Sequence, residues 1–523
     1  MMLNRQGRPT TPHAAANSAV TGTITGNRGL QMEEALIFEI GEEGRTGVDL
    51  PDAPKVKDRL GGLKRQGKIG LPGLSEPQVV RHFVRLSQKN YSIDAGLYPL
   101  GSCTMKHNPR LNEKMARLPG LGDIHPLQPA STVQGALELI DQLAGWLKTL
   151  TGMPAVAMSP AAGAHGELCG LMAIRAALKA RGDVRKRILA PESAHGTNPA
   201  TAALCGYTVD PIPATAEGRV DLDALQAKLG PDVAAIMLTN PNTCGLFERD
   251  IKKVAEMVHA AGAFFYCDGA NFNAIVGKVR PGDLGIDAMH INLHKTFSTP
   301  HGGGGPGSGP VVLSDALKDF VPVPYVVHGS DGYRLVESGD TKSFGRMKAF
   351  NGQMGMFIRA LAYMMSHGAD GLKRVAEDSV LSANYVMASL KDVMSPSFEG
   401  PCMHEALFDD RFLKDTGVTT LDFAKAMIDE GYHPMTVYFP LVVHGAMLIE
   451  PTESESKDSV DAFVSTLRGL AEKAKQGDQV EWFQGAPRLT PRRRLDETRA
   501  ARSPVLRWKP GSNGAPIDKA AAE

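Results

Sequence analysis

The sequence has no excess of charge of either sign, since its 523 residues contain 57 Lys and Arg and 57 Asp and Glu. This balance argues against nucleic acid or an acidic membrane surface as a partner, because both attract basic proteins. Long apolar runs are also missing: no stretch approaches the ~18 residues needed to cross a bilayer, and the N-terminus lacks the apolar core of a signal peptide. We therefore expect a protein without membrane contact that acts on small molecules.

Cysteine is scarce and scattered. The six cysteines show no CxxC spacing and lie mostly in apolar surroundings, as reduced packing residues do. They are Cys103, Cys169, Cys205, Cys244, Cys267 and Cys402. The pattern favours a reducing compartment and predicts a cytoplasmic protein, and no metal site is predicted.

Composition and patterning divide the chain into five parts. Residues 1–30 have no periodicity and are predicted to be disordered, and residues 31–130 are predicted to form an arm with one or two helices, one near residues 75–90. Residues 131–325 are expected to form a large domain and residues 326–489 a smaller α+β domain, followed by a basic tail over residues 490–523. In the smaller domain we expect helices at about residues 352–367, 372–390 and 459–475 and a strand at residues 435–439.

The large domain alternates strand-like and helical segments. Short apolar runs predict buried strands at Ala155–Met158, Arg187–Ala190, Val233–Thr239, Ala263–Cys267 and Met289–Leu293. Helices are expected between several of them, at Leu168–Ala180 and Ile251–Ala261. This α/β order predicts a mostly parallel sheet covered on both faces, and such sheets bind ligands beyond the carboxyl ends of their strands.

Lys295 follows the last of these strands and precedes a run of six glycines within Gly302–Gly309. Such a run fits no helix or strand interior and lets backbone approach a ligand closely. An amine partly shielded from water loses its proton more readily, so it can attack a carbonyl and form a Schiff base with pyridoxal phosphate. Taken alone, the pattern also fits a surface lysine beside a flexible loop, and residues elsewhere must decide.

The other strand ends carry groups that such a cofactor needs. Ala162, Gly163 and Ala164 precede an apolar helix, where free backbone N–H groups can hold a phosphate. Asp268 ends the fourth predicted strand, and a carboxylate there can keep a pyridine nitrogen protonated. A phosphate turn, a ring acid and a lysine at successive strand ends together predict a pyridoxal-phosphate site, with Lys295 and Asp268 as catalytic residues.

Three further residues are predicted to contact the cofactor. His195 follows the second predicted strand and can stack on a planar ring as a third catalytic residue, although it also fits a structural histidine. Asn242 follows the third strand and can hydrogen-bond to a ring hydroxyl, and His294 lies directly beside Lys295.

Long phrases of the sequence resemble the catalytic, C-terminal part of the glycine cleavage system P-protein, the pyridoxal-phosphate glycine decarboxylase. They include YPLGSCTMK, AAGAHGE, SAHGTNPA, LTNPNTCGLFERDI, NLHKTFSTPHGGGGPGSGP and YFPLVVHGAMLIEPTESESK, and the match extends from about Leu36 to Trp508. The resemblance implies an aminotransferase-like fold, with Lys295 forming the Schiff base, Asp268 at the pyridine nitrogen and His195 against the ring. It offers Arg346, His404 and the loop Ser102–Lys106 as candidates to bind the glycine carboxylate or the lipoyl sulfurs.

The activity implied by the resemblance is decarboxylation of glycine with transfer of the aminomethyl group to the lipoyl group of the carrier H-protein. The match covers only the second half of single-chain P-proteins, so we expect glycine dehydrogenase subunit 1 as a partner, in a heterotetramer of two copies of each subunit. The alternatives are another pyridoxal-phosphate decarboxylase or aminotransferase, and a non-catalytic subunit of such a complex.

Overall fold

The computed structural model describes residues 34–507, except residues 53, 58, 68, 303, 304 and 340. The described residues form two compact units: residues 91–484, and residues 34–90 together with residues 485–507. Residues 1–30, predicted to be disordered, lie outside the described residues, as does the predicted tail beyond residue 507. Residues 91–130, which the sequence assigns to the arm, belong to the larger unit.

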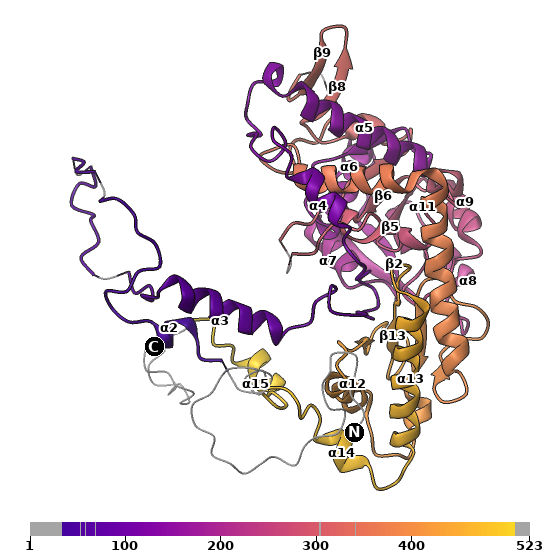
Figure 1. The fold of residues 1–523 in the computed structure, drawn as a ribbon. Coiled ribbons are helices and arrows are strands. Elements are labelled where there is room, and N and C mark those ends of the chain that lie inside the picture. The colour runs from indigo at the N-terminus through magenta and orange to yellow at the C-terminus, as the bar shows by residue number, and fades with distance from the viewer. Residues whose placement is uncertain are drawn as a thin grey trace. The chain divides into compact units, whose positions relative to one another are not determined.

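The smaller unit consists largely of extended chain with helices α2 (Ile37–Ile40), α3 (Glu76–Gln88) and α15 (Glu497–Arg502) (Figure 1). Helix α3 confirms the helix predicted near residues 75–90. The carboxylate of Glu34 accepts hydrogen bonds from Arg85 Nε (2.9 Å) and Lys89 Nζ (3.4 Å). The bond from Arg85 is the main reason why the pKa of Glu34 falls to about 2. Apolar side chains of α3 are left half exposed, including Val80 (52%) and Phe83 (54%).

A seven-stranded sheet forms the centre of the larger unit (Figure 1). Its strand order is β1-β7-β6-β5-β4-β2-β3; the neighbours from β6 to β3 pair in parallel, and β7 is antiparallel to both of its neighbours. The strands are β1 (Ala155–Ala157), β2 (Arg187–Pro191), β3 (Thr208–Ile212), β4 (Val233–Thr239), β5 (Phe264–Gly269), β6 (Ala288–Ile291) and β7 (Val311–Leu313). The five predicted strands are present. The prediction missed β3, whose apolar run is broken by Asp210 and Pro211, and β7, which has three residues.

Helices cover both faces of this sheet, so side chains along each central strand alternate between two cores. On β4, Ile236 and Leu238 pack in the core that contains α5 (Gln134–Thr151) and α9 (Ile251–Ala260). Ala235 and Met237 pack in the other core, with α6 (Gly163–Ala180) and α7 (Thr197–Leu204). Helix α6 begins before the predicted residue 168, and this places the predicted phosphate turn at its N-terminus.

The C-terminal part of the larger unit is the predicted smaller α+β domain. Its antiparallel sheet has the order β10-β11-β13-β12, with a core that includes Leu407 and Leu448. The elements are β10 (Ser395–Pro396), β11 (Ala406–Asp409), β12 (Thr436–Val437), β13 (Met447–Ile449), α12 (Thr420–Asp429), α13 (Lys457–Ala474) and α14 (Val480–Gln484). Elsewhere the unit contains α4 (Arg110–Ala116), α8 (Leu222–Lys228), α10 (Leu293–Thr296) and the hairpin β8 (Tyr325–Gly329) and β9 (Gly332–Val336).

Helix α11 (Met354–Leu390) connects the two domains. It consists of the two predicted helices, separated by a kink at Gly368, where φ is 64° and ψ is −176°. Glycine adopts this conformation without the steric cost that a Cβ brings. Before the kink, Arg359 forms an ion pair with Glu113 of α4 (2.8 Å); after it, the Tyr385 hydroxyl donates to Asp461 of α13 (2.7 Å).

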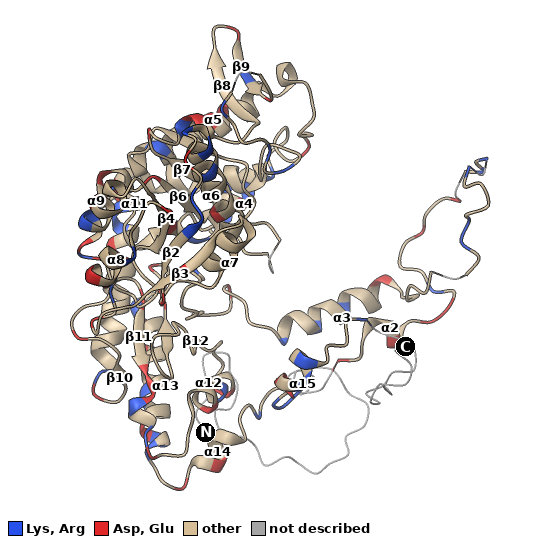
Figure 2. Cartoon of the chain, turned by 180° about the vertical axis from the view of Figure 1, so that it is seen from behind, with Lys and Arg blue, Asp and Glu red and all other residues tan. Residues whose placement is uncertain are grey.

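Charged residues of both signs lie on the outer helices of the larger unit, such as α5 and α9 (Figure 2). Among the described residues, no helix combines the length and the apolar character needed to cross a membrane.

Candidate active site

A cavity lies beyond the carboxyl ends of the parallel strands, where the α/β pattern predicts a ligand site. It is lined by the turns after β2, β4, β5 and β6, by the start of α6 and by one loop from residues 91–130. The lining residues are Ser102, Gly163, Ala164, Glu167, His195, Thr197, Thr239, Thr243, Asp268, Ala270, Asn271, His290, Asn292 and Lys295.

Lys295 lies in α10, the single turn that follows β6. Its side chain is 8% exposed, and its Nζ donates a hydrogen bond to the Ser102 carbonyl oxygen at 2.7 Å. The amine therefore ends in the cavity, and a neutral backbone oxygen is its hydrogen-bond acceptor.

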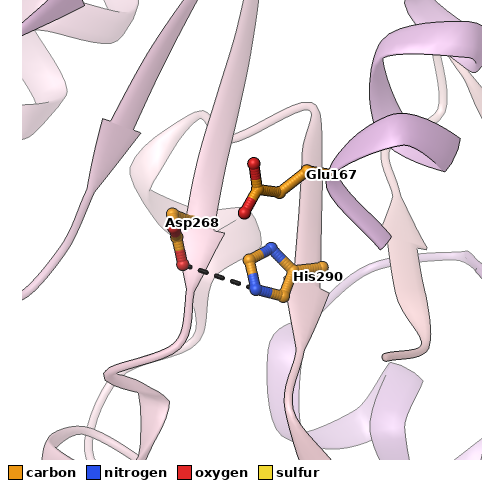
Figure 3. Close-up of side chains that lie close together, drawn as sticks. All are labelled: Glu167, Asp268 and His290. Atoms are coloured by element: carbon orange, nitrogen blue, oxygen red, sulfur yellow. Dashed lines mark ion pairs between the residues drawn. The ribbon is translucent and has the colours of Figure 1, made fainter. Parts of the chain in front are cut away.

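Asp268 faces His290 across neighbouring strands, as Figure 3 shows, with 3.4 Å between Oδ1 and the ring Nε2. The Ala270 N–H also donates to Oδ1 (2.9 Å). Burial raises the pKa of Tyr266 well above its usual value, so its hydroxyl keeps its proton and donates to His290 Nδ1 at 2.6 Å. Burial also lowers the pKa of His290. We assign its single ring proton to Nε2, which points at Asp268.

Glu167 is a residue of this site that the sequence predictions omit. It lies one helical turn after Gly163 in α6 and lines the cavity, and its carboxyl group points towards Asp268 and His290 (Figure 3). Thr197 Oγ1 donates to its Oε1 (2.7 Å) and Thr201 Oγ1 to its Oε2 (3.2 Å). Burial and then the nearby Asp268 raise the pKa of Glu167, which favours its protonated form. Its helical spacing from Gly163 was the available sequence signal.

The start of α6 forms another wall of the cavity. Gly163 and Ala164 are in the first turn, whose N–H groups have no acceptor within the helix, and Ala162 is the N-cap residue. A Cβ on Gly163 would lie 2.7 Å from Asn292 Nδ2, so only glycine fits without displacing that side chain. The turn thus presents free backbone donors to the cavity.

Two lining side chains hold buried oxygen atoms that accept and donate no hydrogen bond. They are Thr239 Oγ1 and Asn292 Oδ1. Burying a polar atom without a partner is costly. These atoms, together with the free N–H groups of α6 and the Lys295 amine, fit a polar ligand that carries an anionic group and a carbonyl.

His195 reaches the cavity edge and is otherwise exposed. Its ring Nδ1 accepts a hydrogen bond from the Thr197 N–H at 3.2 Å, and its ring lies edge-on to Phe439 with 5.6 Å between centroids. Partial burial lowers the pKa of His195. A neutral, fixed ring at the cavity mouth is suited to contact a planar ligand.

The structure does not bring Asn242 or His294 to the cavity, in contrast to the prediction. The Asn242 side chain closes its own turn: its Oδ1 accepts from the Cys244 N–H (3.0 Å), and its Nδ2 donates to Glu248 (2.7 Å). The neighbouring Thr243 lines the cavity instead. His294 is absent from the lining: its ring lies edge-on to His301 with 5.3 Å between centroids, its Nε2 is 3.3 Å from Asn292 Nδ2, and burial lowers its pKa to about 3.

One of the candidates for contacts with substrate and carrier, Ser102, lines the cavity. Lys106 of the same loop is buried in an ion pair with Glu453 at 2.6 Å. His404 is fully buried behind this loop. Arg346 lies outside the cavity and pairs with Glu337 at 3.2 Å.

Two family models match the chain. The model described as aminotransferase class-V matches residues 170–308, and the model described as glycine dehydrogenase, C-terminal domain, matches residues 375–489. Among solved structures, an inhibitor-bound glycine decarboxylase (P-protein) of the glycine cleavage system is 22% identical with a TM-score of 0.66 and covers 78% of this chain and 92% of its own. Sphingosine-1-phosphate lyase from Burkholderia pseudomallei is 14% identical with a TM-score of 0.60, covering 81% of this chain and 97% of its own. These likenesses confirm the aminotransferase-like fold.

Two curated relatives share nearly the whole chain. A protein of Caulobacter vibrioides named probable glycine dehydrogenase (decarboxylating) subunit 2 is 70% identical over 517 residues, which are 97% of this chain and 98% of the relative. A protein of the same name from Caldanaerobacter subterraneus is 50% identical over 485 residues, 92% of this chain and 99% of the relative. The chain belongs to the family of glycine dehydrogenase (decarboxylating) subunit 2 proteins, the family that its sequence resembles.

Proposed function

We propose that this chain is the catalytic subunit that decarboxylates glycine, releases CO2 and passes the aminomethyl group to the lipoyl group of a carrier H-protein. The observation that carries the proposal is the Lys295 amine, which ends in one cavity with Asp268 and the free N–H groups of α6. The relatives' shared name, glycine dehydrogenase (decarboxylating) subunit 2, supports the reaction and its oxidoreductase class.

The cofactor is pyridoxal phosphate. When bound, it supplies an aldehyde that condenses with amines and a protonated ring that accepts electrons released from the bond to a carboxylate group. The cavity fits this group. Lys295 would bind the aldehyde carbon, and the N–H groups of Gly163 and Ala164 would hold the phosphate. Thr239 and Asn292 offer the unpaired oxygen atoms described above.

Asp268 and the groups bound to it bear on the protonation of the cofactor's pyridine nitrogen. We assign to the Asp268 carboxylate the role of keeping the pyridine nitrogen protonated. His290 Nε2–H, fixed by the Tyr266 hydroxyl, faces Oδ1, and the Ala270 N–H donates to the same oxygen, so the carboxylate cannot rotate freely. Because its pKa is raised, Glu167 carries less negative charge beside Asp268 than an exposed glutamate would.

We propose that His195 covers one face of the bound ring and keeps water from it. Replacing His195 with alanine is expected to lower cofactor affinity and the rate by about 10-fold, the value of one aromatic contact. Equilibrium dialysis of the cofactor and exchange assays measure both effects. His125→Ala is the matched control, because its Nδ1 also accepts an N–H from two residues onward (Leu127, 3.1 Å) but lies outside the cavity lining. If His195→Ala had the cofactor affinity and exchange rate of the wild type, His195 would have only a structural role.

The name shared by the relatives, subunit 2, implies a partner subunit 1, and we propose a heterotetramer of two copies of each. The smaller unit supports a partner because it leaves large apolar side chains exposed, including Leu50 (80%), Leu63 (89%) and Leu71 (74%). Obligate interfaces typically bury more than ~2,000 Å² of accessible surface and are rich in apolar side chains. A cytoplasmic location remains a prediction from the cysteine pattern.

Glycine-dependent exchange of 14C-bicarbonate into glycine tests the proposal. We expect exchange from this chain mixed with subunit 1 and lipoylated H-protein, and little or none when subunit 1 is left out. Full exchange by this chain with H-protein alone would contradict the partner assignment. Exchange with larger amino acids in place of glycine would favour another decarboxylase of the same fold, and no cofactor absorbance at all would favour a non-catalytic subunit.

A further inference from the structure

Ser102, whose carbonyl accepts the Lys295 amine, has an unusual backbone. Its φ is +62°, in the left-handed region that residues with a Cβ seldom adopt. Such conformations persist where surrounding contacts impose them, and they are often found at functional sites. The contacts that hold Ser102 in this conformation therefore determine where its carbonyl oxygen, the acceptor of the Lys295 amine, lies.

The smaller α+β domain binds the Gly101–Ser102 peptide group through both its N–H and its carbonyl oxygen. The Ser102 N–H donates to Glu405 Oε1, just before β11, and the Gly101 carbonyl accepts from Thr436 Oγ1 of β12 at 2.6 Å. Gly101 also packs so closely on β13 that a Cβ would lie 2.6 Å from the Leu448 carbonyl oxygen. The loop is thus fixed against three strands or strand ends of a domain that does not contain Lys295.

Glu405 is unusual among these contacts because it is a carboxyl group with 0% exposure. Its Oε1 accepts the Ser102 N–H, and its Oε2 has no hydrogen-bond partner, with His404 Nε2 3.9 Å from that oxygen. Burying such a group carries a desolvation cost that one hydrogen bond offsets only in part. The hydrogen bond from the Ser102 N–H is therefore the contact through which Glu405 can affect the cavity.

We propose that Glu405 is a positioning residue for Lys295. This inference rests on the proposed function: Lys295 would hold the cofactor, and its amine needs a hydrogen-bond acceptor whenever glycine frees it. Glu405 holds the Ser102 peptide in its left-handed conformation, so that the Ser102 carbonyl is that acceptor. Glu405 itself touches neither the cavity nor the lysine in the structure.

Glu405→Leu tests this role, since leucine fills the space without accepting the Ser102 N–H. Because the released amine then loses its acceptor, glycine should displace Lys295 less readily. Titration of the cofactor-loaded protein with glycine, followed by absorbance, should show a half-maximal concentration about 10-fold higher, the worth of one hydrogen bond to an amine. In crystals of the cofactor-free variant, Ser102 φ should leave the positive range.

Three other variants separate positioning from simple loss of stability. Glu405→Gln keeps an oxygen that can accept the Ser102 N–H and should titrate like the wild type. Glu248→Leu removes another buried carboxyl group that accepts a backbone N–H (Val220, 3.3 Å) outside the cavity, and should leave the glycine titration unchanged even if the protein melts at a lower temperature. Thr436→Val removes the second hold on the loop and should raise the half-maximal glycine concentration by a smaller factor.

The outcomes also distinguish this inference from the proposed function. A wild-type protein that binds cofactor but gives no spectral response to glycine would contradict the proposed function. A wild-type response with an unchanged titration and unchanged Ser102 φ in Glu405→Leu would overturn the positioning role. If Glu405→Leu does not fold, Glu405→Met decides, because methionine also fills the space without a strong acceptor: a titration identical to the wild type would overturn the inference in the same way.

Discussion

Replacing Lys295 with alanine is expected to lower glycine–bicarbonate exchange by at least about 10⁴-fold, as removal of a nucleophile does in other covalent catalysts. The alanine has no amine to bind the cofactor aldehyde, so borohydride reduction of the loaded wild type should attach the label at Lys295 and the variant should not be labelled. Folding should survive. The change removes one hydrogen bond to the Ser102 carbonyl, worth about 1 kcal/mol of unfolding free energy.

Two comparisons make this result specific to the amine. Lys295→Arg retains a cation of similar length but no nucleophile, and it should be as inactive as the alanine variant. Lys278→Ala removes a surface lysine that pairs with Glu377, and it should exchange at the wild-type rate. A reduced label found at any lysine other than Lys295 would show that the site is misassigned.

Asp268→Asn should keep the cofactor but lose on the order of 10²-fold or more in exchange rate, the usual effect of removing a preorganised electrostatic contact. The amide has nearly the same shape and can still accept from the Ala270 N–H, but it carries no negative charge to hold a proton on the pyridine nitrogen. Absorbance measures cofactor content, and the exchange assay, normalised to that content, measures the effect on chemistry.

Asp287→Asn is the matched control for this variant. Asp287 is buried next to β6, accepts the Phe265 N–H (2.8 Å) and forms an ion pair with His259 (2.8 Å), but it lies outside the cavity lining. Its loss should lower the melting temperature and leave the exchange rate per bound cofactor unchanged. If Asp268→Asn exchanged at a near-native rate, Asp268 would not be the group that keeps the pyridine nitrogen protonated.

The groups nearest the chemistry could be predicted from the sequence because each stands where an apolar run stops. Asp268 and Lys295 follow buried strands, and strands in a parallel sheet end at one edge, so local sequence is enough to bring them together. The fold class was predictable for the same reason, since the alternation of short apolar runs and helices is a local pattern.

Side-chain direction could not be predicted in this way. Asn242 follows a strand too, but its side chain turns back to bind backbone N–H groups two and four residues onward, a local alternative to ligand contact that asparagine often adopts. His290 was overlooked because it lies within an apolar strand, although strand alternation separates its face from that of Met289 and Ile291.

Contacts between distant parts of the chain were also beyond prediction. The glycines after Lys295 suggested close approach to a ligand, but a Cβ on Gly309 would lie 2.1 Å from the Ala162 carbonyl oxygen. That glycine is therefore required where the returning chain crosses the start of α6. Only the three-dimensional arrangement distinguishes the two reasons for a glycine.

The hydrogen bond from Lys295 to the Ser102 carbonyl has a mechanical consequence for the cavity. Lys295 belongs to the large domain, whereas the loop that receives its amine is anchored to the small one through the Leu100 to Ile449 bridge and Thr436. A rotation of the small domain against the large one would act as a lever, changing the distance between amine and acceptor while leaving Asp268 and the start of α6 in place.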